Sequence, residues 1–151
     1  MRHSSLDSLK SVARVTAIGP APTRRQLKRQ RLRRLASLME RHGGVVRLFS
    51  RIEHLPYRTL RDLQAKDSPL SIAYNDALLR EEGLRSDKFG DAVEFFCITK
   101  GEAHHLLCDC HYDEKEPIAL AVSARARRLA SRMTMRDRWD SLRGTVVRLF
   151  D

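Results

Sequence analysis

Apolar side chains recur every three or four residues along this chain, and no segment shows sustained two-residue alternation. The first spacing places side chains on one face of a helix, whereas a half-buried strand requires alternation. Glycine and proline interrupt the pattern often, so each helix must be short. We predict an all-α fold, a compact bundle of about seven to nine short helices in a single domain. The 151 residues are enough to bury a substantial core, which is expected to include Leu35, Leu48, Phe49, Phe89, Phe96, Leu107, Val122, Trp139 and Val146.

Capping signals and helix breakers place the helix boundaries. A threonine followed three residues later by Gln or Glu forms a capping box, in which each side chain satisfies a backbone amide of the first turn. The pairs Thr23–Gln26 and Thr99–Glu102 have this spacing. Residues 1–22 are expected to form an N-terminal amphipathic helix or arm, and residues 23–151 the helical domain. Within the domain, the predicted helices are 23–42, 45–52, 57–65, a segment from Ser68 to Gly83, one capped by Ser86 or Asp87, the segment 98–112, one opened by Pro117, and a last one through Met135, Trp139 and Leu149.

Positive charge is concentrated in two regions of the chain. The net charge is +10, and residues 24–51 hold ten basic side chains against one acid. Residues 67–116 hold five basic against twelve acidic side chains, and residues 117–151 hold eight basic against three acidic. Twenty-three of the 29 basic residues are arginine, whose guanidinium group forms forked hydrogen bonds to phosphate and carboxylate, although an arginine-rich codon bias would produce the same excess. The result is an acidic middle between two basic arms.

Clustered basic side chains on helices are typical of proteins that bind nucleic acid or another polyanion, because they attract phosphates and release counterions. The first two turns of the helix that begins after Thr23 have almost no apolar face and should project into water or onto a partner. Alternatively, the charged faces are simply solvated, or the arms fold back on the acidic middle. An adaptor that binds an acidic protein would use the same arms. The residues predicted to contact phosphate are Arg24, Arg25, Lys28, Arg29, Arg33, Arg34, Arg125, Arg128 and Arg132.

Residues 91–107 have the pattern of a helix-turn-helix, with two helical pieces joined tightly at residues 97–99. The turn position that usually needs glycine is Cys97. The helix that would enter the major groove carries Glu102 and Asp109, whose negative charge opposes contact with DNA. We interpret this segment as a packing motif, so any contact with DNA would fall to the basic arms.

Three of the six histidines and two of the three cysteines lie within residues 98–112. On one continuous helix, His104, Cys108 and His111 stand at positions i, i+4 and i+7, along one stripe about one turn apart. Zinc accepts imidazole and thiolate ligands, and water or Cys97 could complete its coordination. These residues are therefore the candidate metal ligands.

Two observations oppose a metal site. A second, distant pair of ligands is missing, and a continuous helix would direct the thiols of Cys108 and Cys110 to different faces. Cys110 would then be a small core residue, and the histidines partly exposed polar residues.

Cys108 could also be considered as a catalytic nucleophile, because two histidines lie one turn away. However, inside a helix it gains nothing from the N-terminal dipole, and no oxyanion donor is evident. We therefore predict a non-enzymatic role without catalytic residues, and no cofactor other than a possible zinc ion.

Two segments of the chain read alike. Residues 31–39 are RLRRLASLM and residues 125–133 are RARRLASRM, and each is followed by Val-Val-Arg-Leu-Phe, at 45–49 and at 146–150. The intervening lengths are five and twelve residues, which differ by about two helical turns. Either a basic helical pair has been duplicated, or a biased composition has produced a coincidence.

No apolar run approaches the roughly 18 residues needed to cross a bilayer, and the first twenty residues lack the apolar stretch of a secretory signal. An odd number of cysteines fits a reducing compartment better than a disulfide framework. We expect a cytoplasmic protein with no membrane partner. The leading hypothesis is a regulatory protein that associates with nucleic acid through its arginine-rich helices. The alternatives are a metal- or redox-sensing domain centred on His104, Cys108 and His111, and an adaptor for an acidic protein.

Overall fold

Residues 21–113 and 119–132 are described by the computed structural model of the chain. This part of the chain contains seven α-helices and one 3-10 helix and no strand, so the prediction of an all-α fold is confirmed. The segments predicted as the N-terminal helix and as the last helix fall outside the described residues, as do Pro117, Trp139 and Val146.

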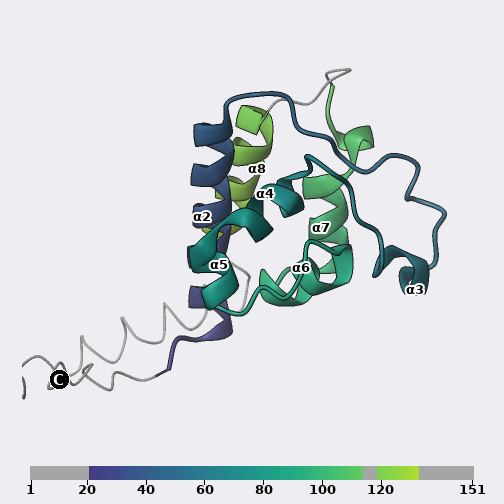
Figure 1. The fold of residues 1–151 in the computed structure, drawn as a ribbon. Helices are drawn as coiled ribbons and strands as arrows, with labels where there is room; N and C mark the ends of the chain where they lie inside the picture. The colour runs from purple at the N-terminus through teal and green to yellow at the C-terminus, as the bar shows by residue number, and fades with distance from the viewer. Residues whose placement is uncertain (1–20, 114–118, 133–151) are drawn as a thin grey trace, which may run out of the picture.

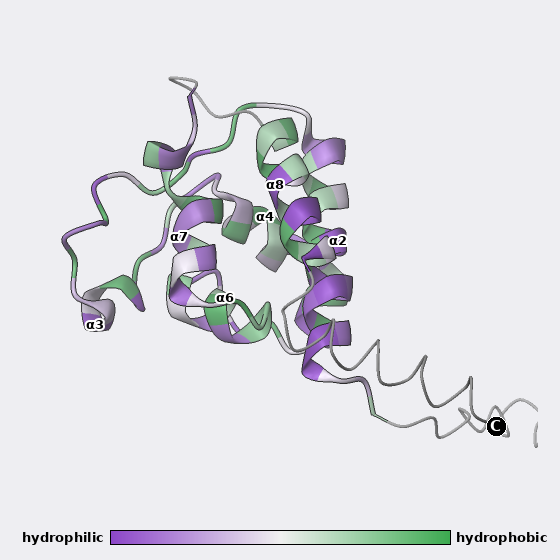
Figure 2. Cartoon of the chain, turned by 180° about the vertical axis from the view of Figure 1, so that it is seen from behind, coloured by the Kyte–Doolittle hydropathy of each residue, from purple (hydrophilic) through white to green (hydrophobic). Residues whose placement is uncertain are grey.

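The longest helices, α2 (Arg24–His42) and α8 (Ala119–Ser131), pack side by side (Figure 1). They run antiparallel, because the N–H of Ala119 at the start of α8 donates to the carbonyl of Gly44, just beyond the end of α2, over 2.9 Å. The N-terminal turns of α2 are hydrophilic (Figure 2), and its buried residues begin at Leu32. This helical pair is one wall of the molecule.

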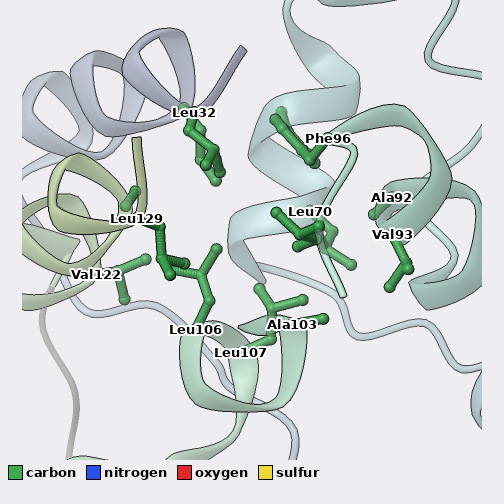
Figure 3. Packing of buried hydrophobic residues seen from close by; sticks show 14 of the residues in the cluster. Leu32, Leu70, Ala92, Val93, Phe96, Ala103, Leu106, Leu107, Val122 and Leu129 are labelled. Atoms are coloured by element: carbon green, nitrogen blue, oxygen red, sulfur yellow. The ribbon is translucent and has the colours of Figure 1, made fainter. Parts of the chain in front are cut away.

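The chain between these two helices forms shorter elements, of which α4, α6 and α7 lie to one side of the α2–α8 pair (Figure 1). Their bounds are α3 Tyr57–Leu60, α4 Pro69–Asn75, α5 Ala77–Glu81, α6 Phe89–Phe95, α7 Lys100–Leu107 and the 3-10 helix η1 Asp109–His111. Side chains of α2, α4, α7 and α8, together with Phe96 after α6, point into one core, where Leu32, Leu70, Leu106 and Val122 are labelled (Figure 3). The seven described residues that were expected in the core are all buried: Leu35, Leu48, Phe49, Phe89, Phe96, Leu107 and Val122.

Both predicted capping boxes are present. The Thr23 hydroxyl accepts from the N–H of Gln26, the Gln26 side chain accepts from the N–H of Thr23, and Thr99 and Glu102 form the same reciprocal pair. Gly43 ends α2 in the left-handed conformation, with φ of 63°. These helix boundaries follow from local signals alone.

The predicted helix over residues 45–52 is wrong, since this segment is extended. Its backbone finds partners elsewhere: the N–H of Phe49 donates to the carbonyl of Leu107 over 2.9 Å, and the carbonyl of Phe49 accepts from the N–H of Asp109 over 3.0 Å. The N–H of Arg47 donates to the carbonyl of Asp67 in the same way. The end of α7 leaves unsatisfied backbone groups, and the extended segment satisfies them.

Three other predicted helices are shorter than expected. The segment 57–65 is helical only to Leu60, and the segment after Ser68 is interrupted at Asp76, whose side chain accepts from the N–H of Leu79 and starts α5. The next helix begins after Lys88 rather than after Ser86 or Asp87. At Asp76 the local side-chain contact competes with continuation of the helix.

The similar segments 31–39 and 125–131 lie on α2 and α8, which pack against each other. Met133 and the second Val-Val-Arg-Leu-Phe, at 146–150, lie outside the described residues. Positions that correspond in the two sequences are buried on both helices. Leu32 on α2 corresponds to Ala126 on α8, Leu35 to Leu129, and Ala36 to Ala130. The equivalent arginines also have similar surroundings. Arg31 lies over the ring of Phe95 and Arg125 over the ring of Tyr112, each 4.0 Å from the centroid, and both donate to backbone carbonyls. The similarity in sequence thus has a structural counterpart, whatever its origin.

Candidate metal centre

Four potential metal ligands converge where the chain before α3 crosses the end of α7. They are Glu53, His104, Cys108 and Cys110, and one donor atom from each lies within 4.8 Å of the others. The sulfur of Cys108 is 3.1 Å from the sulfur of Cys110 and 3.5 Å from Oε1 of Glu53. The cluster therefore offers one carboxylate, one imidazole and two thiols.

The cluster forms because α7 ends earlier than predicted. The helix stops at Leu107, Cys108 is extended with ψ of 135°, and η1 then turns the chain back. The extended residue pairs with Phe49 in an isolated parallel bridge. The expectation that the thiols of Cys108 and Cys110 point to different faces is wrong, because it assumed one continuous helix. Cys108 is fully buried, and Cys110, which was predicted to be a small core residue, is exposed.

His111 lies beside the cluster and not within the group of four. Its Nε2 is 2.7 Å from Nδ1 of His104, and the two rings are nearly perpendicular, at 81°. The remaining nitrogen of His104, Nε2, is buried and has no hydrogen-bond partner in the described part of the chain. A metal-binding histidine typically uses one ring nitrogen for the metal and hydrogen-bonds through the other. His104 has its Nδ1 engaged in this way and its Nε2 free.

The electrostatic surroundings keep the buried thiol protonated and the carboxylate ionised. Burial raises the pKa of Cys108, and its hydrogen bond with Cys110 raises that pKa further. The pKa of Glu53 is lowered by its own backbone amide first and then by hydrogen bonds from Cys110 and Cys108. A buried thiol with a raised pKa is a poor nucleophile at neutral pH, but a bound cation would favour its thiolate form.

The donor set fits zinc. Zinc binds thiolate, imidazole and carboxylate in tetrahedral geometry, with bonds of about 2.3 Å to sulfur and therefore sulfur–sulfur separations of about 3.8 Å. The thiols of Cys108 and Cys110, now 3.1 Å apart, would separate by a small displacement. Hard cations such as Mg²⁺ and Ca²⁺ prefer oxygen ligands and would bind weakly to a site with two sulfur ligands.

A small cleft opens next to this cluster. Its volume is about 320 Å³, and Glu53 and His104 lie in its wall together with Lys100. The rest of the lining is mainly apolar, contributed by Ile52, Leu55, Leu60 and Phe89 with Gly101. The cleft therefore borders two of the four candidate ligands, while Nε2 of His104 itself is buried.

Two of the four candidate ligands were not recognised from the sequence as part of a site. Glu53 lies just after the segment 45–52 that was predicted as a helix, and it had no signal of its own. Cys110 was assigned to the core, because the apolar spacing of the helix was extended past its true end. Cys97, considered as a fourth ligand, lies in the turn before α7, and its thiol donates to the carbonyl of Phe95 at 3.7 Å. It is not among the four convergent residues.

The helix-turn-helix pattern is present as a geometry. Helices α6 and α7 are joined by a short turn in which Cys97 has φ of 55°, the left-handed conformation for which glycine is usually required. The first turn of α7 is engaged with α2, since Glu102 accepts two hydrogen bonds from Lys28, at 2.7 and 2.9 Å. This contact favours the interpretation of the motif as a packing unit.

The residues predicted to contact phosphate fall into two groups. Lys28 and Arg34 pair with Glu102 and Asp76, so part of the first basic arm does fold back on the acidic middle. Arg125 donates to the carbonyls of two histidine residues, while Arg25 is half-buried. The exposed members are Arg24, Arg29 and Arg33 on α2, Arg128 on α8, and Arg132 just after α8.

No helix in the described part of the chain is both long and apolar enough to span a membrane. Comparison of the chain with protein families, with curated proteins and with solved structures finds no match in any of the three.

Proposed function

We propose that this chain is a zinc-binding helical domain, with Glu53, His104, Cys108 and Cys110 as the ligands. The observation that carries the proposal is the convergence of four suitable donor atoms within 4.8 Å. The buried, unpartnered Nε2 of His104 supports it, because an unsatisfied buried nitrogen is unfavourable unless it has a ligand.

The metal would join two distant parts of the chain. Glu53 belongs to the turn between the extended segment and α3, while the other three proposed ligands belong to α7 and the residues that follow it. Glu53 and Cys110 are exposed, so the metal could exchange with solvent more readily than in a closed site. This arrangement favours a metal-responsive role, in which zinc controls how firmly the extended segment is held. A cytoplasmic location belongs to the same proposal, because both thiols must stay reduced.

Zinc content tests the proposal directly. The protein is purified under reducing conditions without chelator, and bound metal is measured by elemental analysis. We expect about one zinc ion per chain, and a Co²⁺-substituted form with the absorption of a tetrahedral thiolate site. Cys110→Ser should lose most of the zinc, and Cys97→Ser, which removes a thiol outside the cluster, should keep it. Equal zinc content in the two variants, or none in the parent, would overturn the proposal.

A second candidate is the association with nucleic acid. Arg24, Arg29 and Arg33 are exposed along α2, and none of them forms an ion pair with a described carboxylate. We propose that these exposed arginines contact phosphates, with an affinity that falls steeply as salt rises. The variant Arg29→Gln/Arg33→Gln should bind an oligonucleotide more weakly than the parent. The control Arg58→Gln/Lys66→Gln removes the same charge from exposed positions outside α2, and equal loss in both would leave only a net-charge effect.

A further inference from the structure

A second concave site lies on the other side of His111, between the end of α7, η1 and α8. Its volume is about 310 Å³, and its wall consists of His105, His111, Arg125, Arg128, Leu129 and Arg132. Three of these residues carry a permanent positive charge, two are imidazoles, and none is a carboxylate. A cavity with this lining attracts anions.

The guanidinium group of Arg125 is fixed in the wall. It donates to the carbonyl of His105 over 2.7 Å and to the carbonyl of His111 over 2.8 Å, and it lies 4.0 Å from the centroid of the Tyr112 ring. Carbonyls and an aromatic ring hold this side chain without cancelling its charge, as a carboxylate would. The pocket therefore keeps a positive charge at a defined position.

Arg128 and Arg132 add two more guanidinium groups to the pocket lining. They are one turn apart, both are exposed, and neither side chain forms an ion pair within the parts of the chain that the structure describes. Arg132 interacts electrostatically with Glu102, but that carboxylate already accepts two hydrogen bonds from Lys28. Neighbouring Arg127, by contrast, is paired with Glu40 and lies outside the pocket lining.

The imidazoles complete the wall. The rings of His105 and His111 are stacked at 3.9 Å between centroids with an angle of 37°, so the two residues form one continuous surface. Ring N–H groups and guanidinium forks are the donors that recognise a phosphoryl group, whose oxygens accept several hydrogen bonds at once. A volume near 300 Å³ is at the small end of the range for ligand sites.

We infer that this pocket binds the phosphoryl group of a small phosphorylated molecule, held by Arg125, Arg128 and Arg132 against the stacked histidines. The inference is independent of the zinc proposal, because it depends on charge and shape on the α8 side of His111. A mononucleotide or sugar phosphate has the appropriate chemistry and size. A nucleic-acid backbone shares the phosphate chemistry, but it would extend beyond a site of this volume.

Calorimetric titration of the full chain tests the inference. The probes are inorganic phosphate and AMP, and the reference is sodium acetate at equal ionic strength. We expect both phosphates to bind and acetate to bind at least about tenfold more weakly, with Arg128→Gln and Arg132→Gln each lowering the phosphate affinity about tenfold or more. Arg127→Gln, which removes the same charge from the same helix, should leave the affinity within about twofold, since exposed charges outside a site contribute little.

Three results would overturn the inference. The first is phosphate binding no tighter than acetate binding, and the second is an equal effect of Arg127→Gln and Arg128→Gln. The third is binding of a single-stranded oligonucleotide with no measurable binding of AMP, which would make this face a nucleic-acid surface. Circular dichroism of each variant, unchanged from the parent, excludes loss of fold as the cause.

Discussion

Nδ1 of His104 and Nε2 of His111 lie 2.7 Å apart, although the two residues belong to different helices. One of these nitrogens must carry the proton and the other must accept it. If Nε2 of His104 binds a metal, Nδ1 carries the proton and His111 is the acceptor. His111 would then fix both the tautomer and the orientation of a metal ligand without touching the metal.

Substitution of His111 tests this relationship. His111→Ala should weaken zinc binding by about 10- to 100-fold, the usual effect of losing a residue that orients a ligand. His104→Ala removes the ligand itself and should weaken binding further. Competition with a chromophoric chelator measures all three affinities. An affinity of His111→Ala equal to that of the parent would show that the hydrogen bond does not support the site.

The cysteines should differ in reactivity. Cys110 is exposed, Cys97 is partly exposed, and Cys108 is fully buried with a raised pKa, so alkylation by iodoacetamide should reach Cys110 first and Cys108 last. Zinc should protect Cys110 and leave Cys97 unaffected. Peptide mass spectrometry after timed alkylation gives each rate. Equal rates at Cys110 with and without zinc would contradict its role as a ligand.

The sequence predicted those parts of the structure that depend on neighbouring residues. The capping boxes at Thr23 and Thr99 are local, and so is the apolar spacing that identified Phe89 and Val122 as core residues. The end of α7 was not predictable in this way, because it depends on hydrogen bonds between Phe49 and the chain at residues 107–109.

The prediction of the candidate site from the sequence was incomplete for the same reason. His104 and Cys108 stood out as a histidine and a cysteine one turn apart, but their partners came from a change in backbone direction. Once the helix stops at Leu107, Cys110 approaches Cys108, and Glu53 arrives on a segment far away in sequence. No periodicity within 98–112 carries information about a carboxylate in the segment before α3.

The α2–α8 interface should be a main source of stability. Leu32 is fully buried on α2, and Leu32→Ala should lower the free energy of unfolding by about 2–5 kcal/mol, through lost apolar contact and the cavity left behind. Leu78→Ala is the matched control, since Leu78 is 51% exposed on α5, and it should cost less than about 1 kcal/mol. Urea denaturation of both variants provides the comparison. Similar losses would show that Leu32 is not packed as the structure has it.

Cys97 holds an unfavourable backbone conformation. Its φ of 55° is accessible to glycine without steric penalty, so Cys97→Gly should stabilise the protein by up to about 1 kcal/mol, after allowance for the greater chain entropy of glycine when unfolded. Cys97→Val should destabilise it by about 1–2 kcal/mol, because a β-branched side chain tolerates this region least. Thermal unfolding monitored by circular dichroism ranks the three proteins. A parent more stable than Cys97→Gly would contradict the expected relief of strain.

The contact between α2 and α8 also predicts a dependence on pH. The carboxylate of Glu40 accepts two hydrogen bonds from Arg127 and one from Ser123, each at 2.8 Å. The hydrogen bond from Arg127 is the main cause that lowers the pKa of Glu40 from 4.5 to about 2, and Ser123 adds to it. Because the folded-state pKa lies below the unfolded one, the ionised carboxylate stabilises the fold above pH 4.5, and this stabilisation is lost as the pH falls towards 2.

Glu40→Gln should therefore be less stable than the parent at neutral pH, and the difference should disappear as the carboxylate of the parent becomes protonated. Both groups are largely exposed, so the effect should be small and should shrink further in high salt. Denaturation midpoints of the two zinc-free proteins at a series of pH values give the result, since zinc ligation has a pH dependence of its own. In the background of Arg127→Gln the same substitution should have little effect at any pH, because the charge partner is gone. A difference that stays constant from neutral pH to pH 2 would assign the stabilisation to the shape of the side chain rather than to its charge.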